Sequence, residues 1–117
     1  MIRATYCRKD HSLTIEGHSL SAEKGKDLVC ASASILTYTL AAFVVNTVDA
    51  GFATEKVIKL DEGDAEVSCK VNPDFDATVA LGFDSICAGF GILAQKYPEY
   101  VKYEIINYTR DRKAKQE

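Results

Sequence analysis

Several features that define common protein classes are missing from this chain of 117 residues. Its four cysteines contain no C-x-x-C pair, and their spacing matches no structural zinc site. The N-terminal residues lack the apolar core of a secretory signal, and no run approaches the roughly 20 uninterrupted apolar residues of a membrane span. We therefore expect a cytoplasmic protein that makes no membrane contact and keeps its thiols reduced.

Excess positive charge is also missing. The chain has 14 basic and 17 acidic residues, which gives a formal net charge of −3. Proteins that bind nucleic acid through its phosphates normally carry clustered basic residues, so direct nucleic-acid binding is not expected. Apolar residues make up 47% of the chain and charged residues 26%, as in an ordinary globular protein.

What is present is a regular alternation of strand and helix patterns. Period-two alternation predicts strands at 2–7, 12–16, 55–60, 65–71 and 101–105. Apolar residues at helical spacing predict one helix from about 28 to 49 and a second that opens after Asn72-Pro73-Asp74 and ends near Pro98.

The resulting order is β-β-α-β-β-α-β. It indicates an α+β fold of two layers, in which both helices cover one face of a mainly antiparallel sheet. The length suits a single domain over residues 1–117, and the charged residues at about 109–117 are expected to form a flexible tail.

Cys30 is the residue with the clearest chemical signal. It follows Asp27, a good N-cap, by three residues, which would place it in the first turn of the first helix. The unpaired N–H groups and the positive dipole end of such a turn stabilise a thiolate and can hold an oxyanion. Position alone leaves a structural role open. Cys7, Cys69 and Cys87 are expected to be structural, because buried thiols pack as small apolar side chains.

His18 strengthens the case for chemistry. It follows Gly17 at the mouth of the loop that leads to Cys30, so the imidazole and the thiol can meet beside the start of the helix. A Cys–His pair within hydrogen-bonding reach makes a nucleophile. Asp27 can cap the helix, orient the imidazolium, or do both. The other histidine, His11, lies in a charged turn and is expected at the solvated surface.

The segment Gly17-His18, followed by Gly25-Lys26-Asp27-Leu28-Val29-Cys30-Ala31 and then Ser34, resembles the signature of the ribosomal-processing cysteine protease family, Prp. The resemblance extends over most of the chain, as far as the segment 97–100. It implies a homodimeric enzyme that removes a short N-terminal extension from a large-subunit ribosomal protein, cutting after an aromatic residue.

The resemblance also implies roles for single residues. Cys30 would be the nucleophile and His18 the base, with Asp27 and Ser34 as supporting residues. The loop between the two catalytic residues would order on substrate binding, and its members include Gly17, Ser19, Gly25 and Lys26. Ser19 departs from the family pattern, in which a small apolar residue commonly follows the histidine.

Other functions remain open from the residues alone. The chain could be a non-catalytic module that binds the ribosome or another protein, with Cys30 and His18 serving only in packing. A metal site made of these two residues would have too few ligands, so neither a metal nor a cofactor is expected. Acidic residues cluster around two turns, where they would suit a basic polypeptide or simply be solvated: Asp61, Glu62, Asp64 and Glu66, then Asp74 and Asp76.

Overall fold

Two hairpins and two long helices follow one another along the chain, as the hydrophobic pattern predicted. The computed structural model describes residues 1–17 and 24–107, without the side chains of 24–27. The predicted tail at 109–117 lies outside the described residues. The elements are β1 (Ile2–Cys7), β2 (Ser12–Glu16), α1 (Lys24–Asp49), β3 (Ala53–Asp61), β4 (Asp64–Val71), the short 3-10 helix η1 (Pro73–Phe75), α2 (Asp76–Lys96) and β5 (Val101–Ile106).

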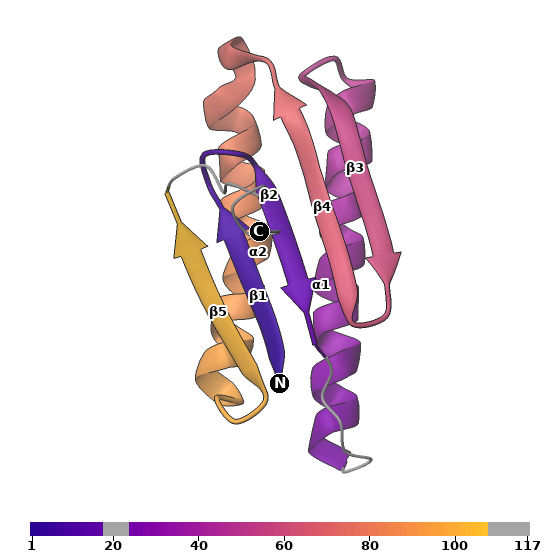
Figure 1. Cartoon of the computed structure of the whole chain (residues 1–117). Coiled ribbons are helices and arrows are strands. Elements are labelled where there is room, and N and C mark those ends of the chain that lie inside the picture. Colours follow the sequence, from indigo (N-terminus) through magenta and orange to yellow (C-terminus); the bar gives the residue numbers. More distant parts are fainter. Residues whose placement is uncertain (18–23, 108–117) are drawn as a thin grey trace, which may run out of the picture.

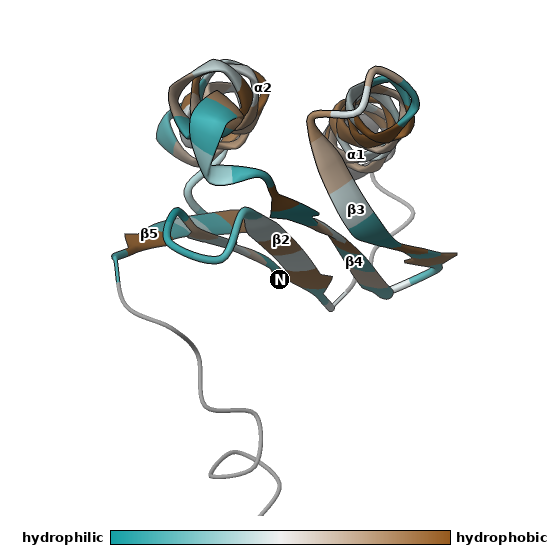
Figure 2. Cartoon of the chain, turned by 90° about the horizontal axis from the view of Figure 1, so that it is seen from above, coloured by the Kyte–Doolittle hydropathy of each residue, from teal (hydrophilic) through white to brown (hydrophobic). Residues whose placement is uncertain are grey.

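The strands form one sheet in the order β3-β4-β2-β1-β5 (Figure 1). Strand β5 pairs with β1 in parallel, and the other three pairings are antiparallel. Both helices lie on the same face of the sheet, so the molecule has two layers (Figure 2). The predicted α+β fold is therefore confirmed.

The register of the sheet places the predicted apolar residues under the helices. Ala4 pairs with Ile15, and Leu13 pairs with both Tyr6 and Val67. All five of these residues are buried. Because side chains alternate between the faces of a strand, this register directs one side of β1, β2 and β4 into the core.

The helices contact each other through glycines. A Cβ at Gly82 of α2 would collide with the ring of Phe43, and one at Gly89 would collide with the side chain of Leu36, both on α1. Glycine weakens a helix by about 1 kcal/mol relative to alanine, and here the cost is offset by close packing. These two glycines therefore set how near α2 lies to α1.

Both helices leave their outer faces uncovered. By length and composition alone, the segments Leu28–Asp49 and Pro73–Lys96 could each cross a membrane. Each, however, packs one face on the sheet, as the core helices of this fold do (Figure 2). Only 33% and 28% of their most apolar stretches are buried, so much apolar surface stays open on the side away from the sheet.

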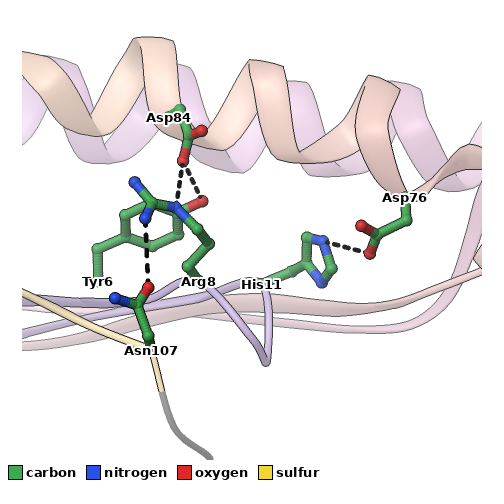
Figure 3. A network of polar contacts seen from close by, with 6 residues as sticks. All are labelled: Tyr6, Arg8, His11, Asp76, Asp84 and Asn107. Atoms are coloured by element: carbon green, nitrogen blue, oxygen red, sulfur yellow. Dashed lines mark hydrogen bonds and ion pairs between the residues drawn. The ribbon is translucent and has the colours of Figure 1, made fainter.

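A polar network ties α2 to β1 and to the end of β5 (Figure 3). The Tyr6 hydroxyl donates to Asp84 Oδ1 at 2.7 Å, and Arg8 Nε donates to the same oxygen at 3.2 Å. Arg8 Nη1 also donates to Asn107 Oδ1 at 3.2 Å. Burial, reinforced by Asp84, raises the pKa of Tyr6, so this hydroxyl stays protonated and keeps donating at any physiological pH.

Candidate active site

A cavity of about 330 Å³ opens at the end of the sheet where β2 ends and β3 turns into β4. One wall is α1, and the opposite wall is made of strand residues and the β3–β4 turn. The cavity is lined by Ile2, Ile15, Gly17, Cys30, Ala33, Ser34, Thr37, Tyr38, Leu60, Asp61, Glu62, Gly63, Asp64 and Ala65.

Cys30 lies on the α1 wall and is partly exposed. Ser34 and Tyr38 follow it at intervals of four residues, so the three share one face of the helix and line the cavity together. The sequence hypothesis singled out Cys30 and Ser34 but missed Tyr38. The same spacing, continued for one more turn, would have found it.

The other thiols are poor candidates for the nucleophile. Cys7, Cys69 and Cys87 are buried, whereas Cys30 is only partly buried. Burial raises the pKa of Cys69, and burial together with nearby Asp84 raises the pKa of Cys87 to about 12. These two thiols therefore stay protonated at neutral pH, and only a thiolate attacks a carbonyl readily.

Helix α1 begins at Lys24, not near residue 28 as predicted. Cys30 therefore lies in the second turn, where a backbone N–H normally bonds to the carbonyl four residues earlier. The prediction that Cys30 sits among unpaired first-turn N–H groups is wrong for this form of the molecule. Asp27 lies inside the helix as well, so it is not the N-cap.

The early start of α1 also shortens the predicted loop. Gly25 and Lys26 were expected in a flexible loop, but their backbone is helical. The apolar stripe begins only after them, and a periodicity argument detects the stripe, not the polar first turn that precedes it. Of the remaining predicted loop residues, His18 and Ser19 lie outside the described residues.

Gly17 brings the end of β2 to the cavity. Its φ of +93° belongs to the left-handed region, and a Cβ at this position would collide with the carbonyl oxygen of Met1. Its N–H donates to the carbonyl of Gly63 in the β3–β4 turn at 3.0 Å. Gly17 thus lines the same cavity as Cys30.

Leu60 departs from its predicted place. It was expected to point into the core from β3, but it is 41% exposed. Leu60 still lies on the inward face of β3, because it pairs with the buried Ala65 of β4. At this end of the sheet, Leu60 lines the cavity. A residue that sequence pattern assigns to the core thus belongs to the site.

His11 is also not where it was expected. It was predicted at the solvated surface, but it is only 7% exposed, with its ring edge against Phe83 at a centroid distance of 5.9 Å. It lies at the opposite end of β2 from Gly17 and plays no part in the cavity around Cys30.

Comparison with known proteins places this chain in a family. The family model described as cysteine protease Prp matches residues 1–102. The ribosomal processing cysteine protease Prp of Mycoplasma pneumoniae (strain ATCC 29342 / M129 / Subtype 1) is 30% identical over 95 residues, which are 80% of this chain and 86% of that protein.

Solved structures share this fold. SMU.848 from Streptococcus mutans superimposes with a TM-score of 0.72 at 28% identity, over 92% of this chain and 96% of that one. The essential ribosomal processing protease Prp of S. aureus, with a covalently linked product peptide, shares the fold with a TM-score of 0.65 at 19% identity, over 90% and 99% of the two chains.

These findings define the class of protein as a cysteine peptidase, in agreement with the prediction. The chain belongs to the Prp family of ribosomal processing cysteine proteases.

Proposed function

We propose that this chain removes an N-terminal extension from a large-subunit ribosomal protein in the cytoplasm, with Cys30 as the nucleophile and His18 as its base. One observation carries the proposal. Cys30, the least buried of the four thiols, shares a cavity of about 330 Å³ with Gly17, the residue directly before His18.

The mechanism follows from these two groups. His18 takes the thiol proton of Cys30, and the thiolate attacks the scissile carbonyl carbon. His18 then gives its proton to the leaving amine, and water resolves the thioester. The oxyanion needs N–H donors, and the first turn of α1, residues 24–27, contains amides that helical hydrogen bonds do not use. A movement of the segment 18–27 over the bound peptide would bring these amides to the carbonyl.

The rim of the cavity favours a basic substrate. Asp61, Glu62 and Asp64 of the β3–β4 turn all line it. Lys59 Nζ lies 2.6 Å from Asp64 Oδ2 and 4.0 Å from Asp61 Oδ2, so its single ammonium group is shared by two of these three carboxylates. The excess negative charge attracts a basic peptide. Segments of ribosomal proteins are commonly basic.

The test is cleavage of a peptide that copies the extended N-terminus of a large-subunit ribosomal protein from the same organism. We expect one bond to be cut, with the products identified by mass spectrometry. A peptide in which the basic residues are replaced by glutamine should have a lower kcat/KM, by about two- to fivefold for each exposed charge pair lost. A purified wild-type protein that leaves the first peptide intact would contradict the proposal.

We further propose that the chain forms a homodimer through the outer faces of α1 and α2. Residues 28–48 contain no charged side chain, and residues 77–95 contain only Asp84. Large apolar side chains on these helices are exposed by more than half, namely Leu28, Ile35, Tyr38, Leu81 and Ile92. An exposed apolar surface of this extent marks an interaction site, and a second copy offers a matching uncharged face.

A charge on this face should break the dimer. Leu81→Glu would bury a carboxylate against an apolar partner, so we expect the dimer dissociation constant to rise by about 100-fold or more. Val57→Glu on the edge strand β3, 44% exposed in the wild type, is the matched control and should leave the dimer unchanged. Sedimentation velocity measures both. A monomeric wild type, or a Leu81→Glu protein as dimeric as its control, would argue against this interface.

A further inference from the structure

A second cavity, of about 500 Å³, lies at the other end of β2. It is formed by the β1–β2 turn, the end of β4 and the start of α2, so it is separate from the Cys30 cavity. Its lining residues carry both signs of charge, with three carboxylates from Asp10, Glu55 and Asp76 and two ammonium groups from Lys9 and Lys70.

His11 is the buried polar group of this cavity. Its side chain is only 9% exposed, and its Nε2 lies 3.2 Å from Oδ1 of Asp76, the first residue of α2 (Figure 3). The direction of this contact does not suit a hydrogen bond, and Nε2 is a buried nitrogen with no hydrogen-bond partner. Asp76 is therefore a charged neighbour of the imidazole but not its hydrogen-bond partner.

The backbone holds His11 in this place. Its φ of +48° is in the left-handed region, which non-glycine residues seldom adopt. Its carbonyl accepts from the N–H of Cys69 at 3.4 Å, and its ring edge rests on Phe83. The imidazole is thus fixed beside the carboxylate of Asp76, whose own side chain is 64% exposed.

With its proton on Nδ1, the imidazole presents Nε2 as an acceptor beside Oδ1 of Asp76. A buried polar atom without a partner is costly, so a ligand that donates to Nε2 and to Oδ1 together satisfies both. A guanidinium group has this form, because its N–H donors lie in one plane and pairs of them point in parallel. An anion would meet three carboxylates, and no cluster of metal-ligating side chains occurs in the part of the chain that the structure describes.

We propose that the cavity at His11 and Asp76 binds the guanidinium group of an arginine side chain. The arginine belongs to a basic peptide segment, and the site is independent of Cys30 and of the peptidase reaction. Lys9 and Lys70 are exposed, so their ammonium groups can turn toward solvent when a cation enters.

The test follows the imidazole of His11 by NMR in the full chain. The His18→Ala variant leaves His11 as the single histidine, which assigns its signal. Titration with N-acetyl-arginine amide should shift that signal in a saturable way. N-acetyl-citrulline amide, which has the same shape without the charge, should bind at least about tenfold more weakly.

Two matched variants locate the site. Asp76→Asn should weaken arginine-amide binding by about tenfold, because it removes the charged acceptor. Asp74→Asn changes a nearby carboxylate that does not line the cavity, so it should leave binding unchanged. An unshifted His11 signal both in this titration and in that of the C-terminal variant described below, equal binding of citrulline amide, or equal effects of the two variants would each overturn the proposal.

The source of the arginine can be an external peptide or the chain's own C-terminal residues. Arg110, Arg112, Lys113 and Lys115 follow the last described residue. Replacing all four by glutamine in the full chain distinguishes the two sources. If the chain itself supplies the ligand, the His11 signal shifts in this variant before any addition, and added arginine amide binds more tightly than to the wild type. If the ligand is external, the variant titrates as the wild type does.

Discussion

Replacing Cys30 by alanine is expected to lower kcat/KM for the extension peptide by about four orders of magnitude or more. The change removes the sulfur atom that forms the thioester, so the rest of the cavity can bind the peptide but cannot cleave it. Because Cys30 is only partly buried, the fold should survive, and the melting temperature should stay near that of the wild type. A continuous assay with a fluorogenic peptide measures the loss.

The matched control is Cys69→Ala, which alters another thiol outside the cavity. We expect it to keep cleavage activity. Brief treatment with iodoacetamide at neutral pH should modify one thiol in the wild type and in Cys69→Ala, but none in Cys30→Ala. The other three thiols are buried, and burial raises the pKa values of Cys69 and Cys87. Full cleavage by Cys30→Ala would refute the assignment of the nucleophile. Slow alkylation of Cys30 in the wild type would favour a non-catalytic binding module instead.

The layers of the fold could be predicted because they depend on local periodicity. Ala4, Tyr6, Leu13 and Ile15 occupy every second position of their strands. Because side chains alternate between the two faces of a strand, this spacing puts all four on the buried face. The apolar stripe of α2 fixed its buried face in the same manner, including Phe83.

The order of strands could not be predicted in this way. Strand β5 pairs with β1 from the other end of the chain, and that pairing depends on how α2 crosses the sheet. The burial of His11 was missed for a similar reason. Its neighbours in sequence are charged, and only its left-handed backbone turns the ring toward Phe83.

The site was predictable where it lies within one segment and unpredictable where distant segments meet. Cys30 and Ser34 came from a short motif whose spacing is helical. The opposite wall, with Leu60 and the acidic β3–β4 turn, comes from a hairpin some 30 residues farther along, and sequence alone gives no means of bringing it to Cys30.

Gly17→Ala is expected to damage both stability and activity. The methyl group would collide with the carbonyl oxygen of Met1, and alanine would be strained at a φ of +93°. Relief of the collision has to move either Met1 or the end of β2, from which the chain continues to His18. We expect the free energy of unfolding to fall by about 1–3 kcal/mol. We also expect kcat/KM to fall by about tenfold to 100-fold, because a base displaced by about 1 Å loses its geometry.

Gly51→Ala separates these two effects. Gly51 has a similar φ of +83°, but a Cβ there would meet nothing within 4 Å, and the residue lies outside the Cys30 cavity. It should therefore show the backbone strain alone. We expect its free energy of unfolding, measured in urea, to fall by about 1 kcal/mol, with unchanged kcat/KM. A Gly17→Ala protein that matches Gly51→Ala in activity would mean that the end of β2 does not position the base. A selective loss of kcat in Gly17→Ala, with KM retained, would tie that glycine to the chemical step through His18.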